Sequence, residues 1–200
     1  MAAAPGVVTA DEMSFEDFLV RYEGVHAEWV DRRVRLDEAR DAETSRLKRF
    51  LGSLLQTWAE DRGLGEVFVG PLAVRLDEHR VLKPDLFFVG AVHAGEMTAT
   101  HFAGVPELVV EIPSVATRGR ARGQRWCDYE TAGVQEYWLI DPDREIAEAW
   151  RLGPKGWYEP VQLGTPPVLQ SDAMGGLRIP AAWLWRKPVP RLRKILREWE

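Results

Sequence analysis

Two acids sit inside apolar stretches of the chain, where an isolated carboxylate is unstable. Asp85 lies within Val-Leu-Lys-Pro-Asp-Leu-Phe-Phe-Val, and Glu111 lies within Leu-Val-Val-Glu-Ile. A buried carboxylate must accept hydrogen bonds, pair with a cation or bind a metal ion. Carboxylate oxygens on neighbouring strands suit Mg²⁺ or Mn²⁺, which needs few protein ligands and keeps waters for a phosphate substrate. The pair predicts a divalent metal site, the alternative being strand-end acids that face solvent or pair with arginine.

Cations lie close to both acids in the sequence. Lys83 precedes Asp85 by two residues, which on a regular strand places both on one face, although Pro84 can disturb that geometry. The alternative for Lys83 is a solvated cation at a strand edge. After Glu111, four arginines occupy eight positions: Arg118, Arg120, Arg122 and Arg125. Guanidinium groups bind phosphates bidentately, so this segment predicts a phosphate-binding patch, unless it is an ordinary solvated charge run.

The elements that must position these residues can be read from periodicity. Alternation over 26–36 predicts a hairpin with its tip at 31–33, and apolar residues at three- and four-residue steps predict a helix over about 41–61. A capping box at Ser14 predicts a short helix before the hairpin. Further strands are expected at these positions: 66–69, 73–76, 81–89, 108–112 and 137–140. Pro84 implies a bulge or an edge within the strand 81–89, and residues 164–180 are expected to carry little regular structure.

These elements predict an α/β (α+β) fold in which helices flank one mixed sheet. A chain of 200 residues fits a single domain, which we expect over 1–185, followed by a basic amphipathic tail helix over 186–200. The tail can touch a DNA backbone, but such a helix more often packs its apolar face on the body or on a second copy. A homodimer assembled in this way remains a possible arrangement.

Composition and charge exclude several classes of protein. With 46% hydrophobic and 28% charged residues, the composition excludes a disordered chain. The net charge of −5 excludes a protein of the histone type that coats nucleic acid, although it allows a local basic patch. A single cysteine excludes an intramolecular disulfide. The chain has no apolar run long enough to span a membrane and no signal-peptide pattern, so we expect a cytoplasmic protein. No Walker or Rossmann motif is present, so no organic cofactor is expected.

Three segments together resemble a known family. They are Pro84-Asp85, the run from Gly104 to Ser114 that contains Glu111, and the run from Tyr129 to Pro142. They are similar to the Uma-type putative restriction endonuclease family, part of the PD-(D/E)XK nuclease superfamily and long filed as a domain of unknown function. The resemblance extends over about 14–185, and its most specific part is Gly-Val-x-Glu-Tyr-Trp-x-x-Asp-Pro. It implies a mixed sheet flanked by helices, a divalent metal and hydrolysis of DNA phosphodiester bonds.

The chain departs from the family pattern at its cations. Where the family has a lysine four residues before the tyrosine matched by Tyr129, this chain has Arg125, and Thr44 takes the place of a histidine that opens the first long helix. The superfamily's lysine two residues after the second acid falls on Pro113. Arginine can stabilise charge on a phosphate, but it stays protonated and cannot accept a proton from water. The resemblance therefore implies an endonuclease whose cleavage is weak.

The resemblance and the residues together assign the following roles. Asp85 and Glu111 hold Mg²⁺ or Mn²⁺, and Glu28, which matches a glutamate in the family's first hairpin, serves as a further ligand or orients the attacking water. Arg125 or Lys83 offsets phosphate charge. The alternative is a catalytically inactive nuclease-fold protein that binds DNA or a protein partner, which the missing lysine favours.

Overall fold

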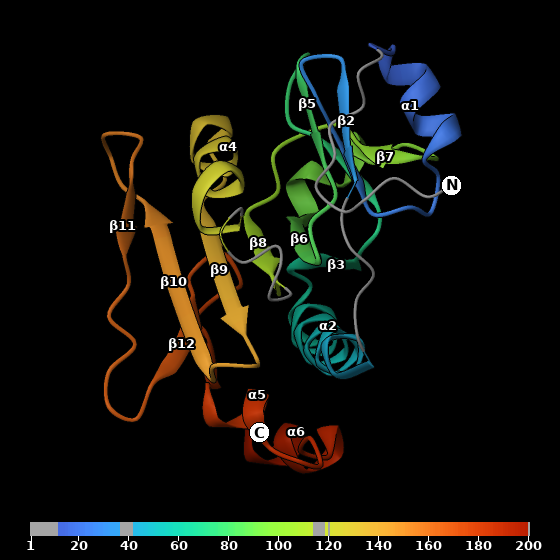
Figure 1. Ribbon diagram of the computed structural model, residues 1–200. Helices are drawn as coiled ribbons and strands as arrows, with labels where there is room; N and C mark the ends of the chain where they lie inside the picture. The colour runs from blue at the N-terminus through green and yellow to red at the C-terminus, as the bar shows by residue number, and fades with distance from the viewer. Residues whose placement is uncertain (1–11, 37–41, 114–118, 120, 200) are drawn as a thin grey trace.

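A six-stranded sheet lies at the centre of this computed structural model, which describes residues 12–36, 42–113, 119 and 121–199 (Figure 1). The order of its strands is β11-β10-β9-β8-β6-β3. Their bounds are β3 (Gly65–Val69), β6 (Leu86–Gly90), β8 (Leu108–Glu111), β9 (Glu136–Asp141), β10 (Ile146–Leu152) and β11 (Tyr158–Pro160). The central strand β8 pairs parallel with β9 and antiparallel with β6. The apolar run at 108–112 is therefore a central strand, as its sequence predicts.

Each face of this sheet carries its own hydrophobic core, because side chains alternate along every strand. One face, with Leu86 and Val110, packs against helix α2 (Ala42–Arg62), which confirms the helix predicted over about 41–61. The other face, with Phe87 and Val109, packs beside α4 (Trp126–Ala132). Apolar residues on both faces explain why β6 and β8 read as continuous apolar runs in the sequence.

A second sheet of five strands, in the order β2-β1-β5-β4-β7, lies beside the first. Its strands are β1 (Ala27–Val30), β2 (Arg33–Leu36), β4 (Ala73–Arg75), β5 (Arg80–Leu82) and β7 (His101–Phe102). Helix α1 (Phe15–Arg21) packs on this sheet through Phe18, and Ser14 Oγ accepts a hydrogen bond from Asp17 N at 3.1 Å. The predicted N-terminal helix and hairpin are both confirmed.

The strand predicted over 81–89 is two strands in two different sheets. The break falls at Lys83-Pro84-Asp85, where the chain leaves β5 in the smaller sheet and enters β6 in the larger one. Proline lacks the N–H that a continuous ladder needs, so the chain turns there instead of bulging. The expectation of one sheet is therefore wrong, and Asp85 stands at the junction of two.

The segment 164–180 also differs from expectation, because it forms a hairpin. Strands β12 (Val168–Ser171) and β13 (Leu177–Pro180) pair antiparallel as a separate two-stranded sheet. Leu169, Leu177 and Ile179 are buried in the core on the α2 side of the large sheet. Burial of these side chains against the rest of the molecule outweighs the segment's proline and glycine content.

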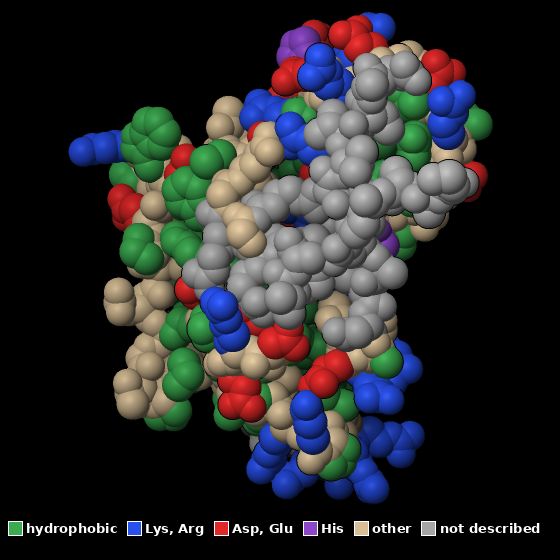
Figure 2. Space-filling view, in the orientation of Figure 1, with side chains coloured by type: hydrophobic (Ala, Val, Ile, Leu, Met, Phe, Trp, Pro, Cys, Tyr) green, Lys and Arg blue, Asp and Glu red, His purple; other side chains and the backbone are tan. Residues whose placement is uncertain are grey.

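Short helical segments complete the described chain. They are η1 (Ala91–Glu96), the π-helical segment η2 (Ala121–Arg125), α5 (Ala182–Trp185) and α6 (Leu192–Trp199). Within the tail helix predicted over 186–200, the structure has a helix at α6, which packs Ile195 into the core. Its cations Arg193, Lys194 and Arg197 are exposed, as is Arg191 just before it. Figure 2 shows Lys and Arg side chains gathered at the lower end of the molecule, where Figure 1 places α6. None of the helices in the described part of the chain could cross a membrane. The single domain over 1–185 stays a prediction.

Candidate functional site

Asp85 directly precedes β6 and Glu111 is the last residue of β8, so both lie at one end of the β6–β8 pair. The register joins their sequence neighbours, Leu86 and Val110. Both acidic side chains have 0% exposure. The structure thus brings together and buries the two acids that the sequence singled out, and each needs partners inside the protein.

Asp85 has two partners that come from different elements. Its Oδ1 lies 2.5 Å from Nζ of Lys48 in the second turn of α2, and its Oδ2 accepts a hydrogen bond of 2.6 Å from the backbone N–H of Ile112. Lys48 is itself 6% exposed. Both carboxylate oxygens of Asp85 therefore have a partner inside the protein.

Glu111 is held from the opposite face of the sheet. Its Oε2 lies 2.6 Å from Nη1 of Arg125, and its Oε1 accepts a hydrogen bond of 2.9 Å from the hydroxyl of Tyr129 in α4. The same guanidinium donates through Nε to Oε1 of Glu28 in β1. Arg125 therefore bridges two glutamates from the two sheets through two different nitrogens of its planar guanidinium, a geometry that the single nitrogen of a lysine ammonium does not reproduce.

Two buried tyrosines surround this cluster and stay neutral. Burial raises the pKa of Tyr129 well above its ordinary value of 10.0, and the charge of Glu111 raises it further. Burial likewise raises the pKa of Tyr137, with added contributions from Glu111 and Asp85. The Tyr129 hydroxyl accordingly keeps its proton and donates a hydrogen bond to Glu111.

The chemistry of this donor set fits a divalent metal ion. Three carboxylates, those of Glu28, Asp85 and Glu111, face the two cations Lys48 and Arg125, so the five groups carry a formal charge of −1. Mg²⁺ needs only one or two carboxylates and fills its other positions with water and phosphate oxygens. Within the described ranges, no group of three or more His, Cys, Asp or Glu side chains could hold a metal ion. A site here would therefore depend on two carboxylates, Asp85 and Glu111, which the sequence predicts as the ligands.

Lys83 lies apart from Asp85 despite its proximity in sequence. Its ammonium donates to the backbone carbonyls of Tyr22 and Val25 at 2.7 and 2.9 Å, and burial lowers its pKa to about 8. The break at Pro84 removes the strand alternation that would have placed Lys83 beside Asp85. Lys83 holds the connection between α1 and β1, and Lys48 contacts the acid instead.

Sequence reasoning missed Lys48 and Tyr129 as members of the cluster. Lys48 lies one turn after Thr44 and one turn before Leu51, on the buried stripe of α2. A lysine at an apolar position of an amphipathic helix indicates a buried ion pair, because a buried charge needs a partner. Which acid supplies that partner cannot be read from the helix.

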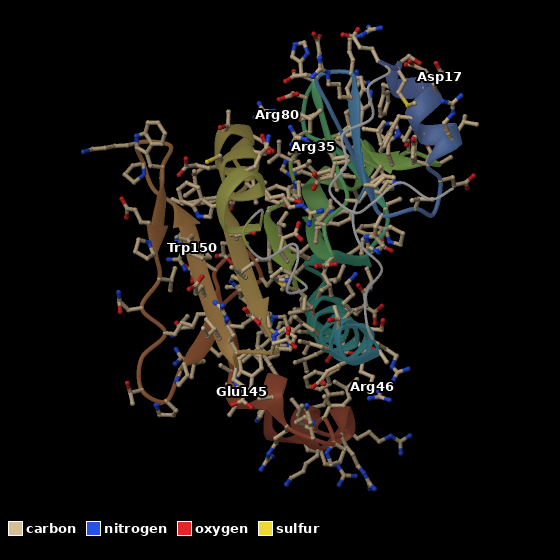
Figure 3. All side chains as sticks on the ribbon, in the orientation of Figure 1. Asp17, Arg35, Arg46, Arg80, Glu145 and Trp150 are labelled. Carbon is tan, nitrogen blue, oxygen red and sulfur yellow. The ribbon has the colours of Figure 1, made fainter. Side chains whose placement is uncertain are left out.

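The predicted arginine patch is only partly described. Arg118 and Arg120 lie outside the described residues, and so does the side chain of Arg122. Arg125 is 2% exposed and contacts the two glutamates, so it does not lie on an open surface. Arg35 and Arg80 of the smaller sheet lie beside α4 in Figure 3, and the Arg80 guanidinium is 3.7 Å from Oδ1 of Asp128.

Comparisons with known proteins found a family model and a solved structure that resemble this chain. A family model named Uma2, described as putative restriction endonuclease, matches residues 15–182. A crystal structure of a putative nuclease of the DUF820 group from Anabaena variabilis is similar in fold, with a TM-score of 0.65 and 15% sequence identity. The similarity covers 80% of this chain and 89% of that one. No curated protein matches the chain.

Proposed function

Because this chain belongs to the Uma2 family of putative restriction endonucleases, we propose that it is a divalent-metal-dependent endonuclease that hydrolyses DNA phosphodiester bonds. The observation that carries the proposal is the buried pair Asp85 and Glu111 on neighbouring strands, each matched to a cation. Ionised, buried carboxylates that lack a metal or substrate role are a liability for stability, which makes an accidental arrangement a poor explanation.

Each residue of the cluster has a role in this proposal. Asp85 and Glu111 would hold Mg²⁺ or Mn²⁺, which when bound polarises the phosphate and lowers the pKa of an attached water. Arg125 pairs with Glu111 and orients it, while Glu28 contacts another nitrogen of the same guanidinium. Tyr129 orients the second oxygen of Glu111 by its hydrogen bond. Glu28 thus acts through Arg125, as a positioning residue.

Nicking of supercoiled plasmid with Mg²⁺ or Mn²⁺ tests this function. Asp85→Asn and Glu111→Gln should each abolish nicking, whereas Asp61→Asn, an exposed acid at the end of α2, should nick like the wild type. Circular dichroism must show that the variants fold. Equal nicking by the wild type and Asp85→Asn would refute the assignment.

A second candidate, a nuclease-fold protein that binds DNA without cleaving it, has one observation in its favour. All four oxygens of the two acids already have partners within the protein: Lys48, Ile112, Arg125 and Tyr129. If the ion cannot share these carboxylates, the wild type will bind duplex DNA and leave it intact with either metal. This result would favour a DNA-binding function over the endonuclease function.

A further inference from the structure

A pocket of about 600 Å³ lies beside the charged cluster, between α2 and the end of β3. Its walls include His26 just before β1, Lys48 and Arg49 of α2, and Gly70 after β3. Gly70 donates its backbone N–H to the carbonyl oxygen of Asp85 at 2.9 Å. The pocket is therefore adjacent to the buried acids.

The lining of this pocket favours an anion. Lys48 and Arg49 contribute two positive charges, and His26, Ser45 and Gln56 add polar groups. Not one Asp or Glu occurs among the described residues that line it, although the chain as a whole carries a net charge of −5. Positive charge concentrated in a recess raises the local concentration of anions such as phosphate.

Lys48 connects the pocket with the acids. Its side chain lines the pocket, and its ammonium lies 2.5 Å from Oδ1 of Asp85. An ammonium carries three N–H donors, so it can hold a carboxylate oxygen and a phosphate oxygen together. The two cations that the sequence predicted near the acids donate elsewhere, Lys83 to two backbone carbonyls and Arg125 to two glutamates.

We propose that this pocket binds the scissile phosphate of DNA, with Arg49 at its mouth, and that Lys48 is the catalytic lysine, supplied by helix α2 and not by a strand. The inference rests on the proposed endonuclease function and names the phosphate subsite of the same centre. It gives the chain a lysine at the active centre although Arg125 and Pro113 stand where the family and superfamily patterns place one.

Lys48 acts on the phosphate during hydrolysis. The oxygen of a water molecule forms a bond to phosphorus while the bond from phosphorus to the leaving sugar oxygen breaks. One proton of the water ends on that leaving oxygen through solvent, and the other stays on the new phosphate monoester or passes to solvent. Negative charge grows on the non-bridging oxygens in the transition state, where the Lys48 ammonium stabilises it by a charge-assisted hydrogen bond.

Two substitutions in the full chain test the assignment. Lys48→Met should lower kcat for plasmid nicking by about 100-fold or more, the loss typical of one transition-state donor. Arg49→Ala should raise KM and leave kcat within a few-fold. Lys155→Met, at an exposed turn between β10 and β11, is the matched control and should change neither constant.

Binding provides a readout that is independent of cleavage. Fluorescence anisotropy of a labelled duplex, with Ca²⁺ in place of Mg²⁺, measures the slope of log affinity against log salt. Lys48→Met and Arg49→Ala should each flatten this slope by about 0.9. Inorganic phosphate should compete weakly with the duplex in the wild type. A Lys48→Arg variant serves if Lys48→Met does not fold, since it keeps the charge but misplaces it, and its kcat should fall by about tenfold.

The outcomes separate this inference from the proposed function. If Lys48→Met nicks like the wild type with an unchanged salt slope while Asp85→Asn is inactive, the inference fails and the endonuclease stands. If Asp85→Asn nicks normally, the endonuclease function fails. If the wild type never nicks but both pocket variants flatten the slope, the phosphate subsite is supported and the catalytic role of Lys48 is overturned.

Discussion

The ammonium of Lys48, in the second turn of α2, lies 2.5 Å from the carboxylate of Asp85, at the point where the chain passes from the smaller sheet to the larger one. Both side chains are almost fully buried. Their contact therefore joins the long helix to the junction of the two sheets. A pair in this position affects both the stability of the fold and the charge of the site.

A double-mutant cycle should reveal the strength of this contact. Lys48→Met should lower the free energy of unfolding by about 3–5 kcal/mol, because it leaves the Asp85 carboxylate buried without its cation. Adding Asp85→Asn should recover much of that loss, since no unpaired charge then remains. Urea denaturation of the four proteins measures the coupling. Strictly additive losses would mean that the two side chains do not interact in solution.

Metal binding should be visible as thermal stabilisation. If Asp85 and Glu111 hold the ion, Mg²⁺ or Mn²⁺ at about 100 times its dissociation constant should add about 2.7 kcal/mol to the folded state and raise Tm. Glu111→Gln should remove this increment, and Asp61→Asn should keep it. Differential scanning fluorimetry with and without EDTA makes the comparison. An increment of the same size in Glu111→Gln would exclude Glu111 as a ligand.

Replacement of Arg125 by lysine should weaken the cluster. The guanidinium donates to Glu28 through Nε and to Glu111 through Nη1, so two separate nitrogens face the two glutamates. In a lysine a single ammonium nitrogen carries all the donors, and it cannot occupy both of these positions at once. We expect Arg125→Lys to lower the free energy of unfolding by about 2 kcal/mol, the value of a lost hydrogen bond to a charged group. Chemical denaturation measures it, with Arg151→Lys on β10 as the control. Unchanged stability would show that the bridge adds nothing.

The salt dependence of DNA binding should locate the backbone contacts outside the pocket. Arg118, Arg120 and Arg122 directly precede Arg125 in the sequence, so they remain the predicted patch near the acids. Each Arg→Ala change there should flatten the slope of log affinity against log salt by about 0.9, with little dependence on DNA sequence. A truncation after Pro188, which removes the exposed cations of α6, tests the tail. A loss confined to the truncated protein would assign the contact to α6.

Asp128 should make stability depend on pH. Burial raises the pKa of this carboxyl above its ordinary value of 3.8, against the opposing charge of Arg80. The folded protein then keeps the proton to a higher pH than the unfolded chain does, so stability falls as pH rises from 3.8 through the raised pKa. Relative to the wild type, Asp128→Asn should gain stability over this window and hold a constant advantage above it. Urea titrations at several pH values test this, and a relative loss with rising pH would contradict it.

Much of the fold could be predicted because its signals are local. The capping box at Ser14, the alternation of β1 and β2 and the apolar stripe of α2 each depend on neighbours in the sequence. The hairpin of β12 with β13 escaped prediction, since its apolar residues are few and acquire their burial from distant elements. Local pattern is weak evidence where tertiary packing supplies most of the stability.

The acids of the site and one of its cations, Arg125, could be found from sequence, but the cation that pairs with Asp85 could not. A carboxylate within an apolar strand needs a partner wherever the strand lies, so Asp85 and Glu111 stood out by residue type and context alone. Two of the predicted cations, Lys83 and Arg125, are buried as well, but Lys83 bonds to Tyr22 and Val25 carbonyls. Proximity in sequence was a poor guide, because Pro84 interrupts the strand between Lys83 and Asp85.

The sequence by itself determined that two acids would be buried on adjacent strands, flanked by a long amphipathic helix, in a chain of this family. Only the tertiary structure decided that Lys48 pairs with Asp85 and that Arg125 bridges Glu28 and Glu111. The physical reason is that burial follows from the apolar character of neighbouring residues, whereas an ion pair depends on the relative placement of elements far apart in the chain. That placement is set by how α2, α4 and the two sheets pack.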